Sequence, residues 1–104
     1  MKNFVTLWKY TKDGLADMKK TPERFEVVKK LVSDAGGRLV LAYGLIGKYD
    51  VLTIIEMPDE KAAMTTILKI CSKGRVIPMT MMALSMEDFL RINIISRYQL
   101  SRST

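Results

Sequence analysis

The sequence predicts a single α+β domain with the element order β-α-β-β-α-β and a short helix near its C-terminal end. Two observations predict this class. Four segments rich in aromatic, β-branched and other apolar residues indicate strands, and two intervening segments repeat apolar residues at helical spacing. The chain has 104 residues, 48% of them hydrophobic and 27% charged, which suits one globular core. We expect one domain over residues 1–92 and a basic tail over residues 93–104.

The first half of the chain predicts a strand, a short helix and a long helix. Residues 4–10 alternate aromatic and β-branched side chains at a period of two, which is typical of a strand. Thr11 is expected to cap a short helical segment. Thr21 is expected to cap the long helix, with Pro22 in its first turn, where the missing N–H is not needed. Gly36 follows its last apolar position and predicts the helix end.

The second half predicts a hairpin, a helix, a strand and a final short helix. Residues 38–46 and 49–57 are expected to pair as antiparallel strands around a tight turn at Gly47. Asp59 is expected to cap a helix that buries the stripe Ala63, Met64, Ile67, Leu68 and Cys71, and that Gly74 ends. Residues 75–84 predict the fourth strand. Ser85, with Asp88 three residues later, predicts the start of the last helix, through Phe89 and Ile92.

This order predicts a ferredoxin-like fold, in which both long helices cover one face of a four-stranded antiparallel sheet. If the other face were exposed to water, each strand should alternate apolar and polar residues. The third and fourth strands instead carry apolar side chains on both sides. Large exposed apolar faces mark interfaces. We expect a homodimer that buries this second face. The alternative is that the terminal helix folds back over it within one chain.

The turn between the second and third strands carries a sequence motif. Gly47-Lys48-Tyr49-Asp50 resembles the Gly-x-Tyr-Asp signature of the GYD-domain family, and the resemblance extends over about residues 3–92. Other matching positions include Thr11, Gly14, Pro22, Arg24, Gly36, Gly37, Tyr43, Glu56, Pro58, Asp59, Thr80 and Phe89. The resemblance implies a small, mostly prokaryotic protein of the dimeric α+β barrel type. It implies no particular activity.

Residue types exclude several kinds of chemistry. The chain has no histidine, which removes His-ligated haem, Ser-His-Asp and Cys-His arrangements and most zinc sites. Cys71 is the single cysteine, so no internal disulfide is available, and a packing role fits it better than a nucleophilic one. No glycine-rich phosphate loop is present. We expect no metal and no cofactor.

The candidate catalytic residues are Asp50, Tyr49 and Glu56. A carboxylate beside an apolar strand can serve as a proton acceptor, and a phenol can donate one hydrogen bond. The competing interpretation gives Asp50 a structural role, in which it caps backbone N–H groups of the hairpin while Tyr49 packs over it. Neighbouring residues of a strand point to opposite faces, which argues against joint action of Tyr49 and Asp50.

The candidate ligand-binding residues are Thr6, Trp8 and Tyr10, which share one face of the first strand, and Tyr43 on an adjacent strand. Together they would line an apolar pocket with polar handles. The competing interpretation is that this aromatic face is simply core. We expect a small apolar or aromatic ligand between the sheet and the helices.

The formal net charge is +6, and three of the excess charges are Arg91, Arg97 and Arg102 near the C-terminus. Spaced arginines without aromatic partners in the third strand do not favour nucleic-acid binding. No apolar run has the length of a membrane span, and no signal peptide is evident, so we expect a cytoplasmic protein without membrane contact.

Three functions remain open from the sequence. The first is a dimeric small-molecule-binding protein without turnover. The second is a cofactor-independent oxygenase or isomerase that uses Asp50, Glu56 or Tyr49 for proton transfer. The third is a purely structural subunit whose function is its interface.

Overall fold

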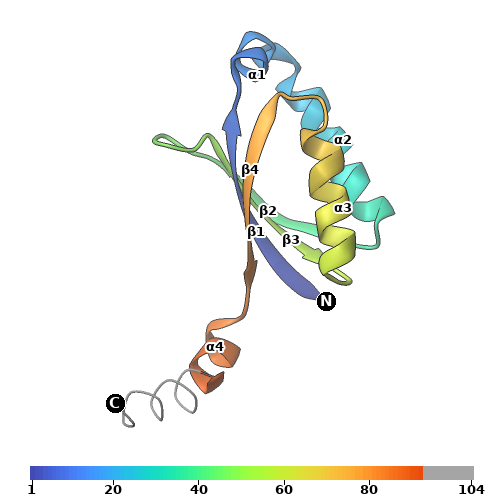
Figure 1. Cartoon of the computed structure of the whole chain (residues 1–104), viewed down its shortest axis with the longest axis vertical. Helices are drawn as coiled ribbons and strands as arrows, with labels where there is room; N and C mark the ends of the chain where they lie inside the picture. Colours follow the sequence, from blue (N-terminus) through green and yellow to red (C-terminus); the bar gives the residue numbers. More distant parts are fainter. Residues whose placement is uncertain (93–104) are drawn as a thin grey trace.

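The computed structural model describes residues 1–92 and shows a four-stranded antiparallel sheet with the strand order β2-β3-β1-β4 (Figure 1). The predicted βαββαβ order and the short last helix are confirmed. The elements are β1 Lys2–Tyr10, α1 Lys12–Ala16, η1 Met18–Lys20, α2 Thr21–Asp34, β2 Arg38–Gly44, β3 Val51–Met57, α3 Glu60–Cys71, β4 Val76–Ala83 and α4 Met86–Ile92. The predicted basic tail, residues 93–104, lies outside the described residues.

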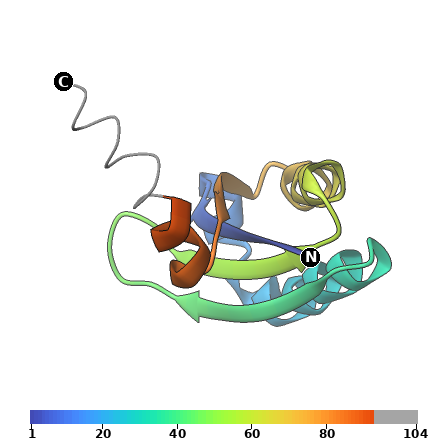
Figure 2. The same cartoon turned by 90° about the horizontal axis from the view of Figure 1, so that it is seen from below.

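Helices α2 and α3 lie on one side of the sheet, as the predicted fold requires (Figures 1 and 2). The core lies between these layers, and its buried apolar side chains are Phe4, Trp8, Val32, Ile55, Met57, Ala63 and Ile67. The buried Thr6 is hydrogen-bonded: its hydroxyl lies 2.9 Å from that of the exposed Thr80, across β1 and β4. Burial of each large apolar side chain stabilises the fold by about 1.5–3 kcal/mol.

The side chains that cap the helices are mostly those that the sequence predicts. Thr11 Oγ1 accepts a hydrogen bond from Gly14 N at 3.2 Å, Asp59 Oδ1 from Ala62 N at 2.8 Å, and Ser85 Oγ from Asp88 N at 3.1 Å. The expected cap at Thr21 is wrong. Thr21 is already helical and makes no such bond, because the 3₁₀ turn η1 runs directly into α2 and leaves no extended residue before it.

The predicted antiparallel pairing of β2 with β3 is confirmed, but the connection is longer than the expected tight turn at Gly47, because β2 ends at Gly44 and β3 begins at Val51. The intervening loop is closed by a 2.8 Å hydrogen bond from Leu45 N to Asp50 O. Asp50 is also bonded to β1, because its own N–H donates to Trp8 O at 2.8 Å. The connection is therefore a longer loop tied to the neighbouring strand.

The face of α3 that packs on the sheet differs from the expected stripe. Ala63 and Ile67 are buried as expected, but Met64 and Leu68 are 68% and 58% exposed, and the buried neighbour is Thr66. The sequence carries apolar residues on two adjacent sides of this helix. Packing against the sheet selects the side that bears small Ala63, which allows a close approach. Cys71 is half-buried at the edge of the core.

The sheet face away from α2 and α3 is apolar, and we call it the open face. Since Phe4, Thr6 and Trp8 are buried under the helices, Val5 and Leu7 point to the opposite side. The strand register places further apolar residues beside them: Leu41, Tyr43, Leu52, Ile54, Ile77, Met79 and Met81. Several are well exposed, including Tyr43, Ile77 and Met79.

Helix α4 does not cover this face. Figure 1 shows α4 beyond the end of β4, away from the body formed by the sheet, α2 and α3. None of its residues is buried. Within the described residues, the expectation that the terminal helix folds back over the sheet is therefore wrong, because α4 continues outward from the end of β4.

Candidate functional site

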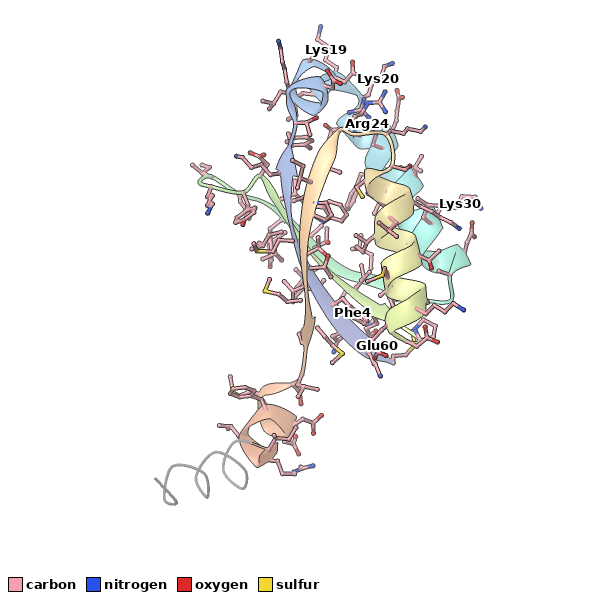
Figure 3. The ribbon with its side chains drawn as sticks, in the orientation of Figure 1. Phe4, Lys19, Lys20, Arg24, Lys30 and Glu60 are labelled. Carbon is pink, nitrogen blue, oxygen red and sulfur yellow. The ribbon has the colours of Figure 1, made fainter. Side chains whose placement is uncertain are left out.

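A cavity of about 380 Å³ lies between α2, α3 and the end of the sheet where β1 finishes and β3 and β4 begin. Its inner wall is apolar and comprises Trp8, Val28, Leu31, Val51, Ile70 and Val76. Its charged lining residues are Lys20, Glu23, Arg24, Lys69, Lys73 and Arg75. Figure 3 labels Lys20 and Arg24 at this end of the molecule.

Trp8 forms part of the cavity wall and is held in one orientation. Its indole Nε1 donates a hydrogen bond to Thr53 Oγ1 on β3 at 2.9 Å. The indole is 5% exposed, so the ring combines an apolar surface with a satisfied polar edge. A wall fixed in this way presents the same apolar surface to any ligand, without a rotamer change.

Tyr10 also lines the cavity, two residues further along β1. Its phenol lies 3.5 Å from the hydroxyl of Thr21, at the start of α2, and its backbone N donates to Asp50 Oδ2 at 2.8 Å. These contacts join β1 to α2 and to the loop before β3. They set the separation between the strand and the helix, which is the width of the cavity at this end.

The guanidinium groups at the cavity mouth are partly neutralised by Asp17. Its Oδ2 lies 3.0 Å from Arg24 Nη2 and 3.4 Å from Arg75 Nε. Desolvation acts to raise the pKa of the Asp17 carboxyl, but hydrogen bonds from Arg24 and Arg75 and the charge of Lys20 together hold that pKa below its ordinary value. Asp17 therefore stays ionised and bridges η1 to the start of β4.

The lysines of the mouth form no ion pair of this kind. Within residues 1–92, no carboxylate forms an ion pair with Lys20, Lys69 or Lys73. Lys69 lies in the last turn of α3, Lys73 lies in the turn that follows α3, and Lys20 ends the 3₁₀ turn before α2. The mouth therefore carries excess positive charge.

The structure brings two of the four predicted ligand-binding residues to this cavity, Trp8 and Tyr10. Thr6 lies deeper under the helices, fully buried and bonded to Thr80, and it does not line the cavity. Tyr43 is 62% exposed and lies on the open face, opposite Leu52 of β3. Strand alternation separates it from the cavity, because the two faces of a sheet do not meet.

The predicted catalytic residues do not converge on one point. The Asp50 carboxylate accepts the Tyr10 backbone N–H. The Tyr49 hydroxyl donates to Met79 Sδ at 3.4 Å, and Glu56 Oε1 accepts from Arg38 Nη2 at 2.6 Å. Each group is engaged in a contact that holds strands or loops together. No described geometry places two of them on a common substrate.

Sequence reasoning did not assign the cationic residues of the mouth to a site. The C-terminal end of a helix favours cations, and this local effect is sufficient to account for Lys69 in the last turn of α3. Lys73 lies in the turn after α3, where helical spacing gives no signal. Lys20 and Arg75 gave no local signal, because their approach to α3 depends on the packing of three elements.

Comparison with known proteins identifies the family. The GYD domain model matches residues 4–92. The chain belongs to the GYD domain family. The suspected resemblance is thereby confirmed, and the match extends over all the elements described above.

One curated relative is similar over nearly its whole length. It is the glutamine synthetase and cystathionine beta-lyase binding protein of Thermus thermophilus, 34% identical over 91 residues. The match covers 86% of this chain and 96% of that protein.

Solved structures share the fold at lower identity. A feast or famine regulatory protein from M. tuberculosis, complexed with L-methionine, matches at a TM-score of 0.62 and 10% identity. This GYD-family chain is 82% covered by the match but spans only 51% of that regulator. FFRP-DM1 matches at a TM-score of 0.55 and 22% identity, over 81% of this chain and 100% of its own.

Residues 1–92 contain neither a metal-binding cluster nor a helix that could span a membrane. No group of three or more Cys, Asp or Glu side chains in this part of the chain is arranged to hold a metal ion. No helix there has both the length and the hydropathy that crossing a bilayer requires.

Proposed function

We propose that this GYD-family chain is a non-catalytic binding protein that takes a small apolar or aromatic molecule in the cavity between its sheet and helices. The observation that carries the proposal is the cavity itself. Its volume of about 380 Å³ lies within the range of ligand pockets, and its inner wall is apolar and includes the fixed indole of Trp8.

The binding protein acts as a homodimer. The open face presents apolar residues from all four strands, and α4 does not cover it. A second copy that applies the same face would bury both, as in a dimeric α+β barrel. Removal of such a face from water is favourable by about 25 cal/mol per Å² of apolar area. This arrangement leaves the cavity free, because the cavity lies on the helix side of the sheet.

A second candidate function is association with a metabolic enzyme. The relative from Thermus thermophilus is named for its binding of glutamine synthetase and cystathionine beta-lyase, and it is 34% identical to this chain over 91 residues. By analogy, this chain binds an enzyme of amino-acid metabolism in the cytoplasm. The two functions are compatible, since a small-molecule site can regulate contacts with a protein partner.

The geometry supports binding over turnover. An oxygenase or isomerase would need a proton acceptor beside the substrate cavity, but the Asp50 carboxylate is occupied by the Tyr10 backbone and Glu56 pairs with Arg38 on the other side of β3. A purely structural subunit would not need a cavity lined by a fixed indole.

Trp8 is the single tryptophan of the chain, so its fluorescence reports directly on the cavity. We expect octanol, which does not absorb where tryptophan emits, to shift the Trp8 emission with saturation. Val28→Phe fills the cavity and should abolish the shift, whereas Val40→Phe on exposed β2 should leave it unchanged. Circular dichroism of both variants is the control for folding. An unchanged emission spectrum of the wild-type protein would refute the proposed cavity.

A further inference from the structure

We propose that the ligand of this cavity is an amphipathic organic anion, whose carboxylate or phosphate head is held by Lys20, Lys69 and Lys73 while its apolar body lies against Trp8. The inference rests on the proposed function, because it specifies the class of molecule that the cavity takes. It follows from the distribution of charge around the mouth.

The lining of the cavity is polarised. The inner wall is built from aromatic and branched aliphatic side chains, including Trp8, Leu31 and Ile70. The charged residues that line it comprise five cations and a single acid, Glu23. A neutral apolar ligand would use the wall and leave the cations solvated. An anion with an apolar body uses both parts of the lining.

Three of the five cations are available to a ligand. Arg24 and Arg75 already share Asp17, which offsets part of their charge. Lys20, Lys69 and Lys73 form no ion pair with any carboxylate of residues 1–92. These ammonium groups are point charges on flexible stems, which adapt to an anionic head group of either kind.

The lysines approach from two sides. Lys69 comes from the last turn of α3, Lys73 from the turn after it, and Lys20 from the turn that precedes α2. Two regions of the chain distant in sequence therefore contribute cations to the lining of one cavity. The dipole of α3 explains why lysine is tolerated at its C-terminus, but it does not explain Lys20, which lies before the N-terminus of α2.

The volume of the cavity limits the size of the ligand. A volume of about 380 Å³ accommodates a single small molecule rather than a full phospholipid with two chains. The inferred ligand is therefore a small organic acid or phosphate monoester with a hydrocarbon or aromatic body. The apolar part contributes most of the affinity, and the cations select the charged head group.

The test compares three probes with the same hydrocarbon chain: octanoate, octyl phosphate and octanol, each titrated against Trp8 emission. We expect at least one of the two anions to bind about threefold to tenfold more tightly than octanol. This is the size of effect that partly exposed charge pairs provide. Added salt should reduce this difference. The stronger anion identifies the head group as carboxylate or phosphate.

Charge variants separate this inference from the proposed function. The double variant Lys69→Gln/Lys73→Gln should lower the affinity for the anion toward that of octanol, with Lys20 retaining part of the difference, and leave octanol binding unchanged. Lys30→Gln is the matched control, because Lys30 lies on α2 outside the cavity and pairs with Asp34. Figure 3 shows Lys30 on α2 apart from Lys20 and Arg24.

The outcomes are distinct. Equal affinity for octanol and both anions, or anion binding unaffected by the double variant, would overturn the anion inference and leave the cavity proposal standing. Failure of all three probes to change Trp8 emission would overturn both. Since the substituted lysines lie on the surface, loss of folding is not expected. Lys20→Gln offers a second variant, in η1 instead of near the end of α3.

Discussion

The carboxylate of Asp50 accepts a hydrogen bond from the backbone N–H of Tyr10 at 2.8 Å, while the N–H of Asp50 donates to the carbonyl of Trp8 at 2.8 Å. One residue of the loop before β3 thus holds two consecutive peptide groups at the end of β1. These are the peptides that carry the two aromatic side chains of the cavity. Asp50 of the family motif is therefore a positioning residue for the cavity wall.

The first prediction concerns this contact. Asp50→Ala should lower the free energy of unfolding by about 1.5–3 kcal/mol, as loss of a hydrogen bond to a charged group does. Asp50→Asn keeps an acceptor oxygen and should lose less. Urea denaturation followed by circular dichroism measures both. Asp34→Asn, on the exposed end of α2, is the control and should change little. Equal stability of Asp50→Ala and wild type would contradict the structural role.

The second prediction concerns the open face. Met79→Lys should raise the dissociation constant of the dimer by about a hundredfold or more, because a charged side chain would be buried without a partner in the interface. Sedimentation equilibrium or native mass spectrometry measures the change. Met64→Lys is the matched control, since Met64 is also exposed but lies on α3, away from the open face.

Three results bear on that prediction. A dimer that survives Met79→Lys but dissociates with Met64→Lys would assign the interface to the helices instead. A wild-type protein that is monomeric at all accessible concentrations would refute the dimer. Retention of the wild-type circular dichroism spectrum by Met79→Lys shows that any change in mass reflects association and not unfolding.

The third prediction concerns a protein partner. The purified chain should bind glutamine synthetase or cystathionine beta-lyase from its own source in biolayer interferometry, with saturation at micromolar or lower concentration. The basis is the relative named for these two enzymes. Immobilised ovalbumin is the control for non-specific adsorption of a basic protein. Binding no stronger than to ovalbumin would restrict the chain's function to its small-molecule cavity and its dimer.

The fourth prediction concerns pH. The folded pKa of Asp17 lies below its ordinary value of 3.8, so the unfolded chain binds the proton more tightly. The stabilisation by this carboxylate is therefore complete above about pH 4, and it is lost as the pH falls through the lowered folded pKa. Between about pH 4 and pH 2, wild type should lose more stability than Asp17→Asn. Parallel losses in urea titrations would show that the pairs with Arg24 and Arg75 contribute nothing.

Local sequence signals determined the elements and most of their ends. The alternation in β1, the apolar repeat of α2 and the caps at Thr11, Asp59 and Ser85 depend only on neighbouring residues, so they could be predicted without knowledge of the fold. The Gly-x-Tyr-Asp motif identified the family for the same reason, because it is contiguous in the chain.

The length of the hairpin loop, the packed side of α3 and the location of the site were decided by tertiary structure. Asp50, at the end of the hairpin loop, is bonded through its carboxylate to Tyr10 of β1, which lies 40 residues away in sequence. The α3 sequence offers two apolar sides, and only contact with the sheet selects Ala63 and Ile67. Trp8 and Tyr10 were accessible to prediction because they share a strand face.

By itself, the sequence determined the fold class, the family and the aromatic wall of the cavity, because these depend on periodicity and on contiguous residues. Only the tertiary structure brought Lys20 of η1, Lys69 of α3 and Lys73 of the following turn to the mouth of one cavity, and separated Tyr43 from it. The physical reason is that the packing of elements distant in sequence gathers these charges at the cavity mouth, and no local sequence pattern predicts that packing.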